Sequence, residues 1–559
     1  MRHSQKHHHD QKTPRFQGVQ VHSLFDQGYY WRNFMSHLKL DRRTFLGGAA
    51  SALSLAALPS FGQTGNPIRL EWQQYKTTWQ YGVFMDTIGK MRANLNANDP
   101  NSWLYWVNVH VNYCPHKLPY FLAWHRGYMW YFERQLKIIS IRSDLTLPYW
   151  DWYTNPTIPS EFTDPMSGNP LYVPRVNTNV YSALDLTPFQ ASTVNFQRGT
   201  VNSFEERFET RPHNPIHNII GNVMSQMTSP TDPIFYLHHC NVDRLWHAWA
   251  LPDGRTMPVS TSPYWTTTGP EPFVYAPGMT MPKVQTYSPR RSGTTAPYRT
   301  AYDYANATRP LVLPPQAQVG RIIRVQASSS RSLKRPPVVT SYTAVPATDI
   351  SADTRSIGGV KNVALGTQSV SVLVTAEAAS VQTIDNVIST TTSDFPDVVA
   401  TTSTTNSTAS DSTVAPAATT NAQKATKRYR SVKVVFDKLA ISAAGAMGGY
   451  FYNVYMDLPD NADIDVVGSK YYIGTLGAFE IASAAHHGSV TLEYPATAAL
   501  VKGRVKASRE HVISLVRVDG TTAPKGQVIA IGEMRVELST DAPFVVSKPQ
   551  KPGRNDIPY

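Results

Sequence analysis

Apolar residues recur at two different spacings along the chain, and each spacing predicts a different kind of structure. Between about residues 69 and 305 they return every three or four positions, as along 72–83, which predicts helices joined by long loops. Asp232-Pro233 resembles a helix N-cap followed by proline in the first turn, so we expect a helix from there through Trp249. This region is therefore predicted to be mainly α, a helical bundle.

Short segments in which apolar and polar residues alternate follow in the second half of the chain. Gly, Pro, Asn and Asp separate them, which predicts an all-β sandwich or barrel. Within 389–426, 18 of 38 residues are Ser or Thr, and this composition favours disorder. The alternating segments are SVSVLV (369–374), SVKVVF (431–436), YYIGTLGAFEI (471–481), SVTLEY (489–494), HVISLVRV (511–518) and VIAIGEMRVEL (528–538).

These patterns divide the 559 residues into four parts. We expect a leader over 1–62 and a helical domain over 63–305. A basic, Pro-rich connector follows over 306–350, and a β-rich domain occupies 351–545. A disordered Ser/Thr-rich loop at 377–428 is expected to interrupt this last domain. A chain of this length can bury more than one core.

The leader carries a twin arginine. Asp41-Arg42-Arg43-Thr44-Phe45-Leu46 precedes a Gly- and Ala-rich apolar run that ends near residue 61. This arrangement resembles a twin-arginine export signal, and the run is too short to span a membrane. We expect export by this route and a periplasmic or secreted protein with no membrane association once mature. The alternative is a basic turn before a buried helix.

The net charge of +12 is unevenly distributed. Residues 1–68 contribute +5 and residues 290–335 contribute +8, while the rest of the chain nets −1. The positive charge thus lies in the leader and the connector, not on the predicted folded domains. A nucleic-acid partner, which needs a basic folded surface with stacking aromatics, is not expected.

Metal chemistry must come from histidines, because the two cysteines cannot build a thiolate cage. Eight of the 17 histidines fall between residues 110 and 247. His213 and His217 are four residues apart, which places both rings on one helix face. Of the neighbours His238 and His239, which point about 100° apart on a helix, we expect only one to join them. Imidazoles without carboxylates at ligand spacing favour copper or zinc.

The motifs around these histidines resemble the type-3 copper proteins, specifically tyrosinases and polyphenol oxidases. They include H-x(8)-H-R, H-N-x-x-H, LPYWDW (147–152), the D-P-x-F-x-L-H-H-x-x-x-D-R-x-W run from Asp232 to Trp246, and Tyr302-Asp303-Tyr304. The resemblance implies two copper ions, oxidation of phenolic small molecules with dioxygen, and a closing Tyr-x-Tyr element at the end of the catalytic domain. A copper-delivery chaperone is a further candidate partner.

The same resemblance implies which residues bind the metal. One copper would be held by His110, His116 and His125, and the other by His213, His217 and His239. His238 is then a neighbour. Arg126 and Asp243 are expected to pair and to tie two ligand helices together. His247 is expected to be an ordinary buried histidine.

Other residues take roles through the family pattern. Cys114, in a C-x-H position, would form a thioether with the His116 ring, the alternatives being a free thiol or a disulfide to Cys240. Asn214 and Glu209 would assist monophenol hydroxylation, with Glu209 orienting a water; the alternative for Glu209 is a surface carboxylate beside Arg211. Met227 is a candidate gate over the substrate entrance.

The β-rich domain resembles the lid of plant polyphenol oxidases, which implies a latent enzyme. The resemblance does not identify the lid residue that would enter the copper site. The expected function is tyrosinase activity on monophenols and o-diphenols. Rival hypotheses are a catechol or o-aminophenol oxidase without hydroxylase activity and, from another class, a haemocyanin-like oxygen carrier.

Overall fold

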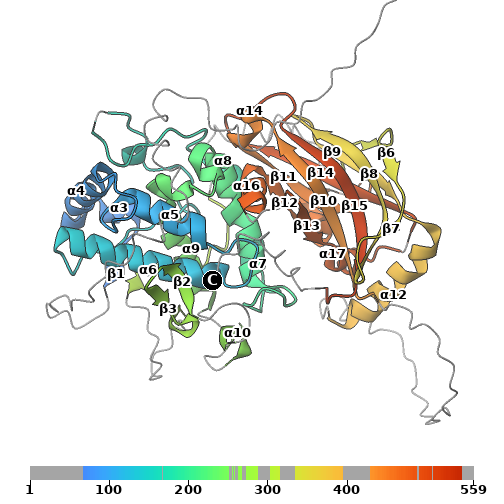
Figure 1. The fold of residues 1–559 in the computed structure, drawn as a ribbon, viewed down its shortest axis with the longest axis horizontal. Coiled ribbons are helices and arrows are strands. Elements are labelled where there is room, and N and C mark those ends of the chain that lie inside the picture. The colour runs from blue at the N-terminus through green and yellow to red at the C-terminus, as the bar shows by residue number, and fades with distance from the viewer. Residues whose placement is uncertain are drawn as a thin grey trace, which may run out of the picture.

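A computed structural model describes most of the chain between residues 67 and 543. The predicted leader at 1–62, with its Arg42-Arg43 pair, lies outside the described residues. Figure 1 shows a helical domain beside a β-rich domain. The described residues are 67–166, 168–250, 255, 257–258, 262–266, 272–286, 302–314, 334–394, 429–461, 463–486, 490–506 and 508–543.

Helices and long loops build the first domain, as predicted. Its α-helices are α3 (Trp72–Tyr75), α4 (Trp79–Ala93), α5 (Trp103–Tyr113), α6 (Phe121–Ser140), α7 (Phe204–Phe208), α8 (Asn214–Ile220), α9 (Ile234–Ala250) and α10 (Pro263–Thr266). Short 3-10 or π turns are η3 (Ser160–Phe162), η4 (Tyr181–Ala183), η5 (Thr187–Phe189), η6 (Glu209–His213), η7 (Asn222–Ser225), η8 (Ser229–Thr231) and η9 (Lys283–Thr286). Strands β2 (Phe273–Ala276) and β3 (Met279–Met281) form a hairpin.

Helix starts follow the capping residues in the sequence. The Asp232 side chain accepts a hydrogen bond from the main-chain N–H of Ile234, so α9 begins where the Asp-Pro pair predicted it. The expected helix along 72–83 is instead two helices, α3 and α4. The Thr78 hydroxyl accepts from the N–H of Gln80 and starts the second one.

The beginning and the end of the helical domain meet in a short parallel pair. Strand β1 (Ile68–Arg69) pairs with β4 (Asp303–Tyr304), the position of the Tyr-x-Tyr element. This pairing closes the domain at residue 304.

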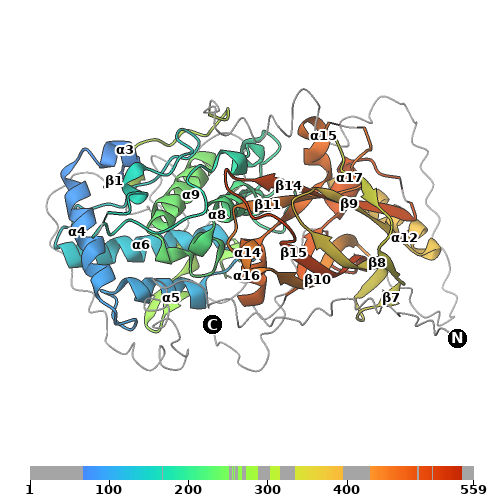
Figure 2. The ribbon, with the colours of Figure 1, turned by 90° about the horizontal axis from the view of Figure 1, so that it is seen from above.

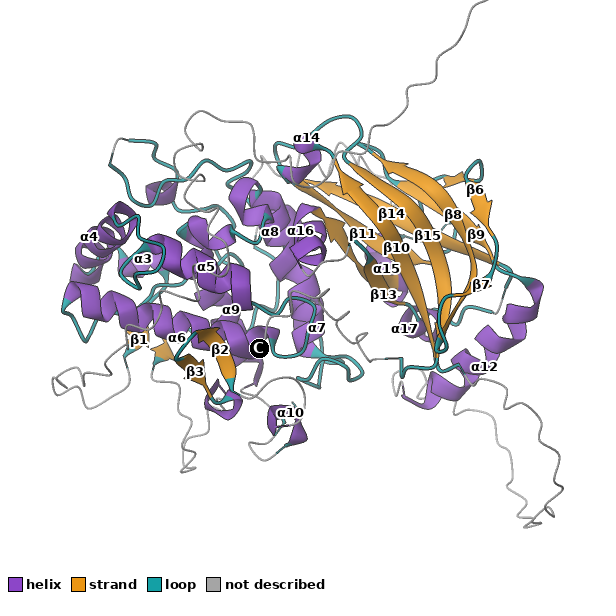
Figure 3. Ribbon diagram, viewed as in Figure 1, coloured by secondary structure: helices purple, strands orange, loops and turns teal. Residues whose placement is uncertain are grey.

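The second domain is a β sandwich, seen as orange strands in Figure 3. Side chains of both sheets meet in one apolar core. One sheet has the order β13-β10-β15-β8-β6, with β7 also on β8, and the other has the order β12-β11-β14-β9-β5. The strands are β5 (Val338–Val339), β6 (Thr343–Val345), β7 (Thr348–Asp349), β8 (Thr354–Leu365), β9 (Val370–Thr375), β10 (Ser431–Ile441), β11 (Tyr450–Met456), β12 (Tyr472–Gly477), β13 (Leu492–Pro495), β14 (Glu510–Asp519) and β15 (Ile529–Ser539).

Helices accompany these strands and correct two expectations. The loop expected to be disordered from 377 begins with an ordered helix, because Ile384 and Val387 share a buried face three residues apart; residues 395–428 lie outside the described part. The connector's last residues form β5 to β7. The helical elements here are η10 (Ala378–Ser380), α12 (Val381–Thr391), η11 (Thr392–Asp394), α14 (Ala443–Ala446), α15 (Ile464–Tyr471), α16 (Ala478–His486) and α17 (Thr497–Lys502).

The segment YYIGTLGAFEI, expected to be one strand, is half strand and half helix. Strand β12 ends at Gly477, where a Cβ atom would lie 2.6 Å from the Asn218 side-chain carbon of the helical domain. Helix α16 starts at the next residue. Figures 1 and 2 both place α16 between the sandwich and α8. The bend therefore brings Phe479 and Glu480 to the boundary between the domains.

Main-chain hydrogen bonds hold the two domains together beside α8. The N–H of Gly449 donates to the Asn218 carbonyl at 2.7 Å, and the N–H of Asn222 donates to the Met447 carbonyl at 2.7 Å. Gly448 has φ +77° and lies so near Gly221 that a side chain would not fit. Among the described residues, we find no helix with the length and apolar character that a membrane crossing requires.

Candidate metal centre

The first histidine group collects three rings from two helices and the loop between them. His110 comes from α5, His116 from the following loop and His125 from α6. All three are buried, and one ligand atom of each, with the Cys114 sulfur, lies within 4.8 Å of the others. The structure thus brings together the three residues predicted for one copper.

Main-chain carbonyls fix two of these rings. His110 Nδ1 lies 2.8 Å from the Met227 carbonyl, and His125 Nδ1 lies 2.8 Å from the Phe121 carbonyl. Each Nδ1–H therefore donates outward, and each Nε2 lone pair points into the group. His110 Nε2 is buried without a hydrogen-bond partner among the described residues, so its lone pair can bind a metal ion.

The second group comes from the end of η6 (His213), from α8 (His217) and from α9 (His238 and His239). His213 Nδ1 lies 2.8 Å from the Asn214 side-chain oxygen, and His217 Nδ1 lies 2.7 Å from the Met224 carbonyl. His213 Nε2 faces His239 Nε2 at 3.4 Å. The rings again turn their Nε2 atoms toward a common point, as metal ligands do.

His238 departs from the expectation that only one of the two adjacent histidines joins this group. It supplies an atom within the same 4.8 Å set, and its ring lies 5.3 Å from the His213 ring and 5.0 Å from the His217 ring. The side chains of His238 and His239 leave α9 about 100° apart. Both rings still come close to His213 and His217, because these two histidines lie beside this part of α9. His239 as the family ligand remains a prediction.

The two groups face one another. The rings of His125 and His239 stack at 4.3 Å with planes 12° apart. Phe121 packs against the His213 ring at 4.6 Å, and Phe235 packs against the His239 ring at 4.2 Å. The six histidines thus form one buried centre rather than two separate sites.

The donor chemistry fits two copper ions. Burial lowers the pKa of His125 to about 3 and that of His217 to about 4, and it lowers the pKa of His110, His213 and His239 as well. The rings are neutral at physiological pH, which is the form that binds metal. Two sets of neutral imidazoles without a carboxylate ligand suit copper.

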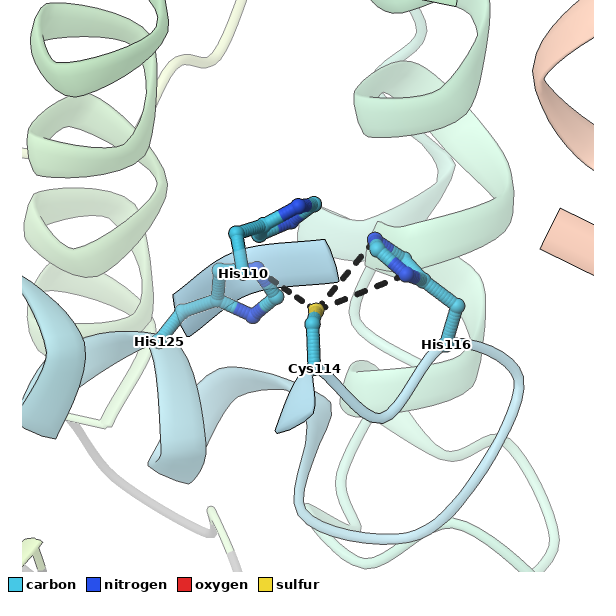
Figure 4. Close-up of side chains that lie close together, drawn as sticks. All are labelled: His110, Cys114, His116 and His125. Carbon is cyan, nitrogen blue, oxygen red and sulfur yellow. Dashed lines mark hydrogen bonds between the residues drawn. The ribbon is translucent and has the colours of Figure 1, made fainter. Parts of the chain in front are cut away.

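The Cys114 thiol lies among the first group, as Figure 4 shows. Its sulfur is 3.4 Å from His116 Nδ1 and 3.3 Å from His125 Nε2. Both cysteines are free thiols in the structure, so a disulfide to Cys240 is not formed. Cys114 thus has the position that a thioether to His116 needs, and the bond itself stays a prediction.

Glu209 is a buried residue, not the surface carboxylate that was the alternative. Its Oε1 accepts the main-chain N–H of Lys117 at 2.7 Å, and its Oε2 accepts from Arg198. Burial raises the pKa of Glu209, while Arg198 and then Lys117 lower it. Arg211, the neighbour expected in that alternative, pairs with Asp185 at 2.9 Å instead.

The predicted pair of Arg126 and Asp243 is confirmed. Arg126 Nε donates to Asp243 Oδ1 at 2.5 Å and joins α6 to α9. Tyr302 donates to the other oxygen of Asp243 at 2.7 Å, and Tyr304 donates to it as well. The Tyr-x-Tyr element therefore helps to fix the two ligand helices.

Met227 contributes its main chain to the site. Its carbonyl orients His110, and its side chain is buried. Its role as a gate over the substrate entrance stays a prediction.

Phe479, which the sequence did not identify, covers the centre from the second domain. Its ring stacks on the His217 ring at 4.3 Å with planes 17° apart, and lies edge-on to the His116 ring at 5.1 Å. Its N–H donates to the Asn218 side chain at 2.9 Å. The sequence signal for it is an aromatic residue two positions after Gly477, where the strand ends and a helix begins.

Comparison with known proteins points to one family. Residues 84–195 and 175–251 match the family model described as the common central domain of tyrosinase. A tyrosinase of Hahella sp. (strain CCB-MM4) is 31% identical over 29% of this chain and 49% of its own length. The chain thus spans about half of that relative.

Other relatives and a solved structure are also similar to this chain. A tyrosinase of Streptomyces glaucescens is 28% identical over 24% of this chain and 63% of its own length. A haemocyanin of Enteroctopus dofleini is 31% identical over 26% of this chain and 6% of its own length. Among solved structures, latent apple tyrosinase is 17% identical with a TM-score of 0.43, covering 86% of this chain and 98% of that chain.

Proposed function

Since this chain is a tyrosinase/polyphenol oxidase-like protein of the type-3 copper family, we propose that it hydroxylates monophenols at the ortho position and oxidises o-diphenols to o-quinones with dioxygen. The observation that carries the proposal is the facing of the two buried histidine groups, with the His125 and His239 rings stacked at 4.3 Å. When bound there, two copper ions supply the redox chemistry with dioxygen. The protein supplies orientation, access and a proton acceptor.

Two residues support the hydroxylase part. Asn214 accepts from the Nδ1–H of His213 and so fixes a ligand ring beside the site of reaction. A phenol must lose its proton before ortho attack, and Glu209 would orient a water that takes it. Each Glu209 oxygen already accepts one hydrogen bond and keeps a second lone pair for such a water.

We also propose that the β-rich domain is an autoinhibitory lid and that Phe479 is its blocking residue. A ring stacked on His217 occupies the space above a ligand that a phenol ring would use. The Asn218 side chain binds both the Phe479 N–H and the Glu480 carboxylate, the latter at 2.8 Å. Activity would then need displacement of α16.

Oxygen uptake on L-tyrosine and L-DOPA tests the activity. The copper-loaded chain should consume oxygen with both once Phe479 is replaced by alanine. Uptake with L-DOPA alone would leave a catechol oxidase. Reversible oxygen binding without turnover of either phenol would indicate an oxygen carrier and contradict the proposal.

The same full-length protein tests latency. Phe479→Ala should raise L-DOPA turnover by roughly 10- to 100-fold with unchanged copper content. Lys502→Ala is the matched control. Lys502 also joins the lid to the helical domain, but its Nζ donates to the Asn202 side-chain oxygen at 2.7 Å and does not contact a ligand ring. Equal L-DOPA turnover by the unmodified chain and by Phe479→Ala would contradict the proposal that Phe479 blocks the site.

Export by the twin-arginine route is a further proposal, supported by Arg42-Arg43 before the apolar run. Replacing both arginines by lysine should leave the protein in the cytoplasm of the producing cell. Unchanged export of this variant would contradict it.

A further inference from the structure

Arg198 lies behind Glu209, in the loop before α7, and the family pattern assigns it no role. Its side chain is 6% exposed, and its Nη2 donates to Glu209 Oε2. Its main-chain N–H donates to Glu205 Oε2 at 3.2 Å, which anchors the loop to α7. The guanidinium is therefore held in place by its own backbone as well as by its ion pair.

On its other side, Glu209 is hydrogen-bonded to the loop that carries His116, a predicted copper ligand. Its Oε1 accepts the N–H of Lys117, the residue directly after His116, at 2.7 Å. Arg198, Glu209 and Lys117 thus form a continuous chain of contacts from the loop before α7 to the loop that carries His116. The carboxylate can neither rotate away nor move back without breaking a buried hydrogen bond.

The surroundings of Glu209 make its charge depend on Arg198. Glu206 of α7 disfavours a negative charge on Glu209, and Glu209 in turn raises the pKa of Glu205 and of the Cys114 thiol. Arg198 is the strongest group that favours the charge, ahead of the main-chain N–H and the ammonium group of Lys117. Burial lowers the pKa of Lys117, and Glu480 of the lid raises it. Without the guanidinium, a carboxyl that is 1% exposed would keep its proton, because burial favours the neutral form.

We propose that Arg198 is a positioning residue for monophenol hydroxylation, which fixes both the direction and the negative charge of Glu209. An ionised and immobile Glu209 holds the proton-accepting water in one place. Oxidation of an o-diphenol depends less on the proton-accepting water that Glu209 holds. The loss of Arg198 should therefore slow monophenol hydroxylation more than o-diphenol oxidation. The inference rests on the proposed hydroxylase activity.

The test compares Arg198→Met and Arg198→Lys in the copper-loaded full-length chain that also carries Phe479→Ala. At pH 7, Arg198→Met should lower kcat for L-tyrosine by about tenfold or more and change kcat for L-DOPA by less than about twofold. Hydroxylation should recover as the pH is raised, because Glu209 then ionises without its partner. Arg198→Lys keeps the positive charge and should restore most of the loss at pH 7.

Arg207→Met is the matched control. Arg207 lies in α7, but donates to Thr193 and Asn202 rather than to Glu209. It should leave the ratio of the two kcat values and the pH profile unchanged. Copper content and thermal unfolding of each variant show whether it is folded, and Arg198→Lys keeps the test informative if Arg198→Met is not.

An infrared readout is independent of turnover. Arg198→Met should show the carbonyl band of a protonated carboxylic acid at pH 7 that disappears when Glu209→Gln is added. Equal loss of both activities, or no such band, would overturn the role of Arg198. A parent protein that oxidises L-DOPA but never hydroxylates L-tyrosine would overturn the proposed hydroxylase activity instead, while the infrared band would still report whether Arg198 sets the charge of Glu209.

Discussion

The two histidine groups share one kind of donor and differ in what surrounds it. In the first group, main-chain carbonyls orient His110 and His125, and the Cys114 thiol lies among the ligand rings. In the second, the Met224 carbonyl orients His217, but the Asn214 side chain orients His213, and an aromatic ring from another domain stacks on His217.

This difference teaches where variation can act. A substitution does not remove a main-chain carbonyl, so the orientation of His110 and His125 depends on the fold and not on one particular side chain. The second group depends on Asn214 and on Phe479, which single substitutions can remove. We therefore expect the first group to be the constant half of the centre, and the second to control hydroxylation and latency.

Removal of a ligand should have the largest effect. His217→Ala should leave one copper per chain in place of two and lower L-DOPA turnover by roughly 10³-fold or more, because both ions are needed to react with dioxygen. Copper analysis after dialysis measures the copper content, and oxygen uptake measures L-DOPA turnover. His247→Ala, which removes a buried histidine of α9 that belongs to neither group, should keep two copper ions per chain. Two coppers in His217→Ala would contradict the assignment.

Loss of the Asn214 amide should separate the two reactions. Asn214→Ala frees the His213 ring to rotate, and we expect L-tyrosine hydroxylation to fall about 10- to 100-fold while L-DOPA oxidation falls less. Steady-state kinetics on both substrates, with copper content as the control, measure the ratio. An equal fall in both would show that Asn214 acts on the metal site as a whole.

A buried carboxyl, that of Glu205 in α7, lies near the second group. Burial raises the pKa of Glu205 to about 7. The unfolded chain releases this proton near pH 4.5 but the folded chain keeps it, so Glu205 lowers the stability increasingly between about pH 4.5 and 7. Glu205→Gln should therefore gain up to about 3 kcal/mol in unfolding free energy at pH 8 and nothing at pH 4.

Denaturant unfolding at the two pH values measures this gain. Glu206→Gln is the control, since Glu206 follows Glu205 on α7 but is only half-buried. A gain for Glu205→Gln that is the same at pH 4 and pH 8 would show that packing, not ionisation, is responsible.

Cys114 should have the smallest effect on turnover. If its sulfur is bonded to the His116 ring, the peptide that contains both residues is lighter by two hydrogen atoms and does not react with a thiol reagent. Cys114→Ser should then lower turnover only a few-fold, because His116 remains a ligand with a less restricted ring. Cys240→Ser is the matched control. A Cys114 that alkylates fully in the copper-loaded protein would exclude the thioether.

The sequence predicted the parts of the molecule that depend on local patterns. The helical and β-rich domains, the start of α9 and the clustering of the six histidines follow from spacing, capping and motif. The pair of Arg126 and Asp243 was found for the same reason, since both residues flank ligands on predicted helices.

Contacts between distant segments could not be predicted in this way. Phe479 lies in a segment that resembles a strand, and its place over His217 depends on docking of the two domains. Arg198 lies in a loop without a pattern, and nothing in the sequence places it against Glu209. The entry of His238 into the second group depends on how α8 and α9 cross, which a helical wheel for one helix does not contain.

The most direct test of the central claim is a crystal structure of the copper-loaded full-length chain with anomalous scattering recorded at the copper edge. We predict two copper peaks, one held by His110, His116 and His125 and the other within the second group, with the Phe479 ring over His217. A single peak, or two peaks with the site open to solvent and Phe479 elsewhere, would contradict the claim that a lid-covered copper pair is the working centre of this protein.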